Sequence, residues 1–162
     1  MAGASEIFCS SADLETGTGF ATLSETSRTH MDRRGRVALL IHRRTKPVIA
    51  AINRSAVVIG ISMTLQMARI VSSESRLGLV FARRGIVVEA ITGYLLPRLI
   101  GKRRATCLAT TGAVYPATDP LWRKLSSKIL PREKILLRAI ELAYDMTKNT
   151  SNISTSLFRD LM

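Results

Sequence analysis

Residues 45–65 constrain the fold most, because they predict a buried strand, a sharp turn and the start of an apolar helix. Residues 48–52 form a continuous apolar run, which is typical of a strand covered on both faces, and Pro47 suits the first position of such a strand. The apolar residues that follow predict a helix over 59–67. The start of a helix presents backbone N–H groups without intrahelical partners. Donors fixed in this way can hold an oxyanion, because they are in place before the charge develops.

Strands and helices are predicted to alternate along the rest of the chain. Further helices are expected over 36–44, 89–100 (interrupted by Pro97), 102–111, 131–148 and 154–161. Short strands or extended pieces are expected over 7–9, 69–73, 77–80 and 126–130, and a surface loop over 15–34. This alternation predicts an α/β fold with largely parallel strand pairing.

The composition predicts one globular domain over residues 1–162. A chain of 162 residues with 46% hydrophobic residues is long enough and apolar enough to bury a core. The longest stretch without a charged residue, 55–68, is too short to span a membrane. Cys9 and Cys107 have no metal-like spacing, so we expect reduced thiols and no metal site. No basic-then-apolar signal segment opens the sequence.

The net charge of +12 is unusual for a globular domain of this size. Such a charge raises the affinity for polyanions, including nucleic acid, anionic lipid and the phosphates of coenzyme A. An aromatic content of 5% argues against a protein that stacks on single-stranded bases, and no known nucleic-acid-binding motif is present. We therefore expect solvated basic faces and no specific nucleic-acid partner. Binding to nucleic acid through charge alone stays an alternative, and it would weaken steeply as salt rises.

Three segments resemble, in order, the motifs of the crotonase superfamily of enoyl-CoA hydratases and isomerases. Residues 8–14 read Phe-Cys-Ser-Ser-Ala-Asp-Leu, and residues 46–52 read Lys-Pro-Val-Ile-Ala-Ala-Ile. Residues 85–101 contain Gly-Ile-Val-Val-Glu and then Leu-Pro-Arg-Leu-Ile-Gly. The resemblance covers the chain from about residue 7 to its end, and it lies closest to the peroxisomal type of Δ3-Δ2-enoyl-CoA isomerase.

The resemblance implies repeated ββα units that coil into a spiral. Members of the superfamily usually have a strand pair, a helix and a further strand before the motif that begins here at Phe8, and helices beyond the point where this sequence ends. We therefore expect a crotonase-like ββα spiral with an incomplete N-terminal part, truncated at both ends relative to a full family domain. Missing strands would leave sheet edges uncovered.

The resemblance also implies a site for an acyl-CoA thioester. In the superfamily two backbone N–H groups hold the thioester carbonyl, and the matching donors here are those of Ser10 and Ile59. Ala12, Asp13 and Phe81 fall at substrate-binding positions. Ser11 and Val58 stand where the superfamily has glycine. If position 58 requires a positive φ, valine there is strained, and its branched side chain could block the thioester.

The resemblance places catalytic carboxylates at three positions, and this chain has an acid at one of them. The pair used by hydratases falls at Ser62 and Phe81, so water addition by two glutamates is excluded. The third position is Glu89, where Δ3-Δ2-enoyl-CoA isomerases carry their base. One carboxylate suffices for isomerisation, because the proton is removed from one carbon and returned to another. Burial among residues 86–88 would desolvate this carboxylate and make it a stronger base.

Two readings of the function follow from these residues. The first is an enoyl-CoA isomerase that needs no cofactor beyond the coenzyme A carried by its substrate, assembles as a homotrimer or hexamer, and works in the peroxisome or mitochondrion, as the resemblance implies. No targeting signal supports that location, and the cytoplasm is the alternative. The second is an inactive, degenerate or truncated relative with at most a binding role, as the lost pocket glycines suggest.

Overall fold

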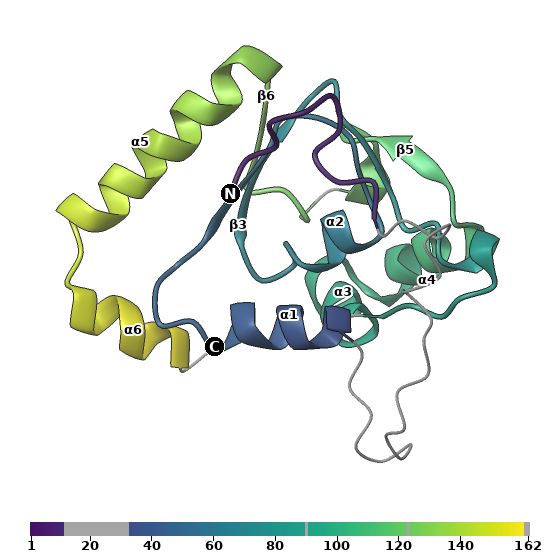
Figure 1. The fold of residues 1–162 in the computed structure, drawn as a ribbon, viewed down its shortest axis with the longest axis horizontal. Helices are drawn as coiled ribbons and strands as arrows, with labels where there is room; N and C mark the ends of the chain where they lie inside the picture. Colours follow the sequence, from purple (N-terminus) through teal and green to yellow (C-terminus); the bar gives the residue numbers. More distant parts are fainter. Residues whose placement is uncertain (12–32, 90, 123, 161–162) are drawn as a thin grey trace.

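A computed structural model describes residues 1–11, 33–89, 91–122 and 124–160. The strands form two small sheets (Figure 1). One has the order β1 (Ile49–Ile52), β3 (Ala68–Ser72) and β6 (Lys128–Leu130), with both pairings parallel. The other has the order β2 (Ala56–Val57), β4 (Arg76–Gly78) and β5 (Val114–Pro116), with β2 parallel to β4 and β5 antiparallel to it. The predicted α/β class with largely parallel pairing is confirmed.

The helices lie on two sides of these sheets (Figure 1). They are α1 (Arg33–His42), α2 (Ile59–Ser62), α3 (Thr92–Ile100), α4 (Lys102–Thr111), α5 (Ile135–Lys148) and α6 (Asn152–Asp160). Short 3₁₀ helices are η1 (Ala82–Arg84), η2 (Pro120–Trp122) and η3 (Arg132–Lys134). In Figure 1, α5 and α6 stand on one side of β3 and α2, α3 and α4 on the other. None of the helices in the described ranges is long and apolar enough to cross a membrane.

Strand β1 is covered on both faces, as its continuous apolar run predicts. Ala50 and Ile52 belong to the main apolar cluster, which also contains the fully buried Phe81 and Trp122. Ala51 points to the other face, where it packs with a smaller cluster that includes residues of α5. The strand therefore separates two cores, and this explains why it has no polar side.

The predicted helix 59–67 is wrong in its length, because α2 ends at Ser62. Beyond that point the amides donate three residues back, as from Thr64 to Ile61 O (2.9 Å) and from Met67 to Thr64 O (2.9 Å). The Thr64 hydroxyl also donates to Ile61 O, at 2.8 Å. Hydroxyl groups that bond to nearby carbonyls compete with the α-helical pattern, so the chain continues as tight turns.

A buried arginine fixes the turn that follows α2. Arg69 is 5% exposed, and its guanidinium donates to Thr64 O at 2.6 Å and to Leu125 O. Burial lowers the pKa of the Arg69 guanidinium to about 10. Desolvation of the charge thus opposes folding, and the hydrogen bonds to the two carbonyl acceptors offset this cost. The same two bonds link the turn before β3 to the segment before β6.

The boundaries of the other elements differ from the sequence prediction mainly at their ends. Helix 102–111 is confirmed, and helix 131–148 starts as η3 before continuing as α5. The loop predicted for 15–34 lies largely outside the described residues, and its last two residues belong to α1. The strand predicted for 126–130 is shorter, because only Lys128–Leu130 pairs with β3.

Helix α3 starts at Thr92 and not at the predicted residue 89. Ile91 caps it with φ 57° and ψ 11°, a left-handed conformation that cannot continue a right-handed helix. The helix then runs through Pro97 to Ile100, so the predicted interruption at Pro97 is also wrong. A branched residue at such a φ is strained, since its Cβ crowds the following carbonyl.

This strain predicts an unusual order of stability at position 91. Both Ile91→Gly and Ile91→Ala remove the half-buried side chain, but only glycine relieves the left-handed backbone. We expect Ile91→Gly to be about 1 kcal/mol more stable than Ile91→Ala, as measured by urea unfolding. In a helix interior alanine is favoured over glycine by a similar amount, so an alanine variant equal to or more stable than the glycine variant would contradict the left-handed assignment.

Candidate active site

The N-terminal segment lies directly against the turn between β2 and α2. Cys9 forms an isolated parallel bridge with Ala56, and Val57 N–H donates to Cys9 O at 3.0 Å. Gly60 allows this approach, because a Cβ at that position would lie 2.7 Å from Cys9 Cβ and 3.1 Å from Cys9 O. Segments some fifty residues apart in the sequence therefore meet at Cys9 and Gly60, next to the two predicted donors.

The two predicted donors have no hydrogen-bond acceptor in the described part of the chain. Neither the Ser10 nor the Ile59 backbone N–H donates there, while Ile61 and Ser62 both donate to Val58 O at 3.0 and 2.9 Å. We call the N–H groups of Ser10 and Ile59 the amide pair. The structure brings their two segments together.

Ser11 and Val58, two of the positions where the resemblance expects glycine, have a positive φ, whereas Arg54, a third such position, does not. Ser11 has φ 82° and Val58 has φ 51°. Val58 combines this φ with ψ −114°, a sparsely populated conformation that costs about 1–3 kcal/mol. Val58 is, however, 6% exposed and part of the main apolar cluster, and burial of a valine stabilises by about 1.5 kcal/mol or more. Packing of the valine therefore offsets the strain of its backbone.

The positions matching the hydratase carboxylates are both buried. Ser62 is fully buried, and its hydroxyl donates to Val58 O at 3.1 Å, inside the same turn as the amide pair. Phe81 is also fully buried and packs in the cluster that contains Val58. Its contact with substrate stays a prediction. Ala12 and Asp13, the other predicted substrate-binding residues, lie outside the described residues.

Glu89 lies in the segment that leads from η1 to α3. Its side chain is partly buried, with Oε1 shielded from solvent, and the preceding Val88 packs against the main cluster. The sequence predicted that residues 86–88 would all surround the carboxylate. Val87 is 83% exposed, so this prediction is wrong for Val87. The carbonyl of Glu89 accepts from Thr92 N–H at 3.0 Å, and this bond closes the turn into α3.

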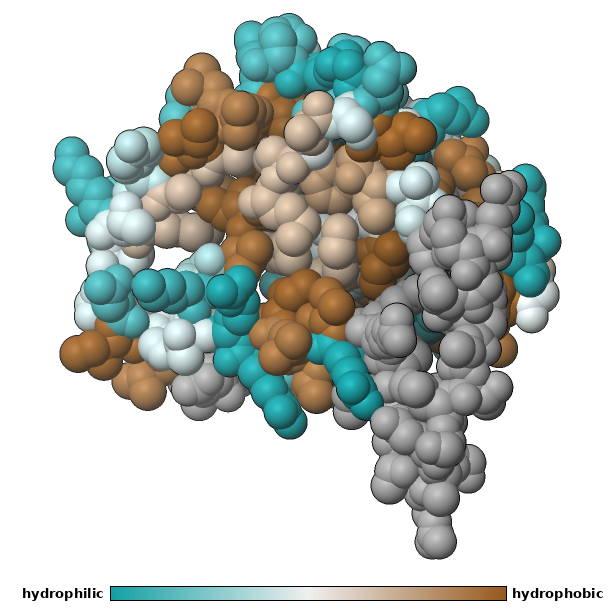
Figure 2. Space-filling view, in the orientation of Figure 1, coloured by the Kyte–Doolittle hydropathy of each residue, from teal (hydrophilic) through white to brown (hydrophobic). Residues whose placement is uncertain are grey.

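Two sizeable hollows lie elsewhere and were not predicted. One hollow of about 850 Å³ lies between the start of β1 and the helices α5 and α6. The other, of about 670 Å³, has Pro47 and Val48 in its lining. Leu136 and Ile140 line the larger hollow and stay 56% and 45% exposed. Figure 2 shows apolar residues, in brown, on the face above it. The signal available in the sequence was the apolar spacing along α5, from which we predicted only the helix.

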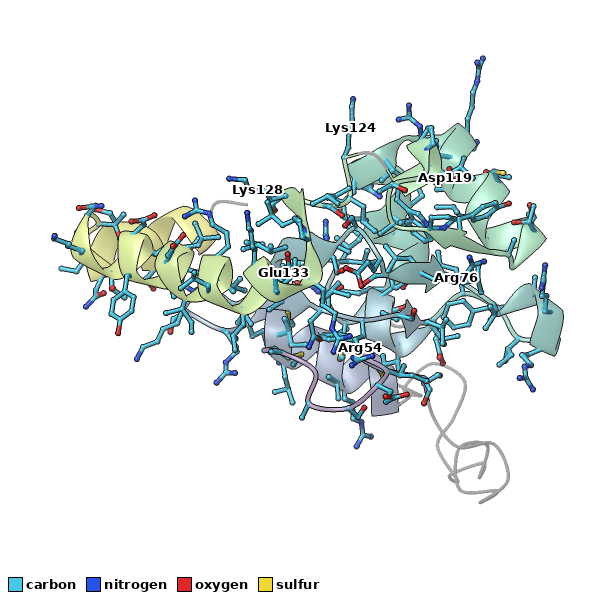
Figure 3. The ribbon with its side chains drawn as sticks, turned by 90° about the horizontal axis from the view of Figure 1, so that it is seen from above. Arg54, Arg76, Asp119, Lys124, Lys128 and Glu133 are labelled. Atoms are coloured by element: carbon cyan, nitrogen blue, oxygen red, sulfur yellow. The ribbon has the colours of Figure 1, made fainter. Side chains whose placement is uncertain are left out.

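The four basic side chains labelled in Figure 3 come from different elements. Arg54 follows β1, Arg76 lies in β4, Lys124 precedes β6 and Lys128 lies in β6, and the four side chains appear at separate places. In the described ranges, no three His, Cys, Asp or Glu side chains are grouped as metal ligands would be.

Comparison with known proteins gives the family. The model of the enoyl-CoA hydratase/isomerase family matches residues 1–162. The chain is 45% identical to the enoyl-CoA hydratase ACTT3 of Alternaria alternata over 162 residues, which is 99% of this chain and 54% of that protein. The chain thus spans about half the length of this relative.

Solved structures show the same fold. The enoyl-CoA hydratase of Bacillus anthracis superposes with a TM-score of 0.85 at 30% identity, covering 98% of this chain and 61% of that one. A monofunctional enoyl-CoA isomerase of Mycobacterium smegmatis superposes with a TM-score of 0.70 at 29% identity, covering 78% of this chain and 60% of that one. The chain therefore belongs to the enoyl-CoA hydratase/isomerase family, within the crotonase superfamily.

Proposed function

We propose that this protein binds an enoyl-CoA and moves its double bond by proton transfer, with Glu89 as the base. The observation that supports this most directly is the amide pair, two uncommitted backbone donors on adjacent segments, in a chain that keeps one of the three carboxylates the superfamily uses. Val58, next to one donor, and Val88, next to Glu89, pack in the same apolar cluster.

The reaction needs only these groups. Glu89 takes a proton from the carbon between the thioester carbonyl and the C=C bond. The electron pair moves onto the thioester oxygen, where the amide pair stabilises the enolate. Glu89 then returns the proton to the far carbon of the original double bond, and the electron pair flows back to form the conjugated double bond. No atom is gained or lost, so a single carboxylate completes the cycle.

Hydration is disfavoured by the residues around the amide pair. Adding water requires a group that activates the water molecule in addition to the group that handles the proton on carbon. The hydroxyl of Ser62 is already bonded to Val58 O, and Phe81 has no polar group. The relative ACTT3 is named a hydratase, but this chain spans 54% of it, so the isomerase assignment rests on this chain's own residues.

Replacing the base tests the assignment. Glu89→Gln keeps the size of the side chain and removes its basicity, so we expect isomerisation of a 3-enoyl-CoA to fall by about 10²–10⁴-fold. The exposed Glu133, labelled in Figure 3 on η3, gives a matched control. Glu133→Gln should leave the rate unchanged. Formation of the conjugated thioester is followed by its ultraviolet absorbance, and hydration by loss of that absorbance from a 2-enoyl-CoA.

Two outcomes would contradict the proposal. Equal rates for the unaltered chain and Glu89→Gln would remove the glutamate from the mechanism, and rapid hydration of a 2-enoyl-CoA would indicate a hydratase. A folded chain with neither activity would instead support the alternative of an inactive relative that only binds acyl-CoA. Localisation and a trimeric or hexameric assembly stay proposals from the family.

The amide pair is tested through the glycine that allows it to form. Gly60→Ala adds a Cβ 2.7 Å from Cys9 Cβ, so the Cys9 segment must move away from α2. We expect kcat/KM to fall by roughly 10–100-fold, because displaced donors no longer meet the oxyanion. Gly93→Ala is the control, since a Cβ there meets nothing within 4 Å. Similar kinetics in both variants would show that the approach of the two segments is irrelevant to catalysis.

A further inference from the structure

Thr92 has a buried hydroxyl without a hydrogen-bond partner in the described part of the chain. The side chain is fully buried at the first residue of α3. An unpaired buried polar group destabilises a fold, and native structures contain few of them. The other threonine that is buried in the described part of the chain is satisfied: the hydroxyl of Thr64 donates to Ile61 O at 2.8 Å. The Thr92 hydroxyl therefore calls for an explanation other than stability.

The position of this hydroxyl in the turn links it to the proposed base. Thr92 N–H donates to Glu89 O at 3.0 Å, and a turn closed in this way keeps the two Cα atoms within about 7 Å. Oε1 of Glu89 is shielded from solvent, as is the Thr92 hydroxyl. In the described ranges, the atoms on Asn53, Trp122 and Ser126 that share the unpaired, buried state of the Thr92 hydroxyl lie far from Glu89 in the sequence.

A hydroxyl is chemically suited to a base that must take up a proton and return it. It can donate to a carboxylate and can also accept from the protonated acid, whereas an ammonium or guanidinium group only donates. Rotation about the C–O bond lets the hydroxyl change between these two roles. We infer that Thr92 is a positioning residue for Glu89, and that its hydroxyl bonds to the Glu89 carboxyl when an enoyl-CoA occupies the site. This inference rests on the proposed function.

The test compares stability with catalysis in the full chain. Thr92→Val keeps the shape and removes the hydroxyl, so the thermal midpoint should rise, because an unpaired buried polar group is lost. The kcat for a 3-enoyl-CoA should fall about tenfold or more, as expected for a lost hydrogen bond to a charged group. The acid limb of the pH profile of kcat, which reports the enzyme–substrate complex, should move to higher pH, because the hydroxyl donor favours the ionised base in that complex. Thr92→Ser should restore both kcat and the profile.

A matched control and the contrary outcomes make the result decisive. Thr64→Val removes a satisfied hydroxyl and should lower the thermal midpoint without moving the pH profile. A lower midpoint for Thr92→Val, or a kcat and pH profile like those of the unaltered chain, would overturn the inference and leave the isomerase intact. Absence of turnover by the unaltered chain would overturn the proposed function and this inference with it.

Discussion

The close contact between the Cys9 segment and the first turn of α2 is the constraint on which the proposed site depends. The contact is made by backbone hydrogen bonds to Ser55 and Cys9 and by the absence of a side chain at Gly60. Without it the Ser10 and Ile59 amides would belong to unrelated surfaces. With it the two segments that carry these amides lie side by side, which is the arrangement that the proposed function requires.

Strained backbone is found beside each predicted element of the site. Ser11, Val58 and Ile91 all have a positive φ, and they lie next to Ser10, next to Ile59 and two residues after Glu89. Such strain is retained when surrounding packing over-determines it, and it gathers at functional sites. Val58 is held by the main apolar cluster, whereas Ile91 is 39% exposed and has less packing to oppose its strain.

Periodicity and motifs predicted the strand β1, the helices α4 and α5, and the residues that would meet at the amide pair. They failed where a local interaction outside the pattern decides the structure. Helix α2 stops early because Thr64 and Arg69 take carbonyls that a longer helix would use, and α3 starts late because Ile91 is left-handed. The hollow beside α5 could not be predicted either, since the helical spacing that marks a buried face does not show how much of that face is covered.

The central claim is that this chain still holds an enoyl thioester at the amide pair despite Val58 and Ser11. Thermal unfolding of the purified chain with and without an enoyl-CoA tests this most directly, because a ligand that binds only the folded state raises the midpoint as its concentration increases. The account predicts a cooperative transition whose midpoint rises with enoyl-CoA and does so less in Gly60→Ala. A cooperative transition that is indifferent to enoyl-CoA would contradict it, and would mean that the folded chain no longer binds the family's ligand.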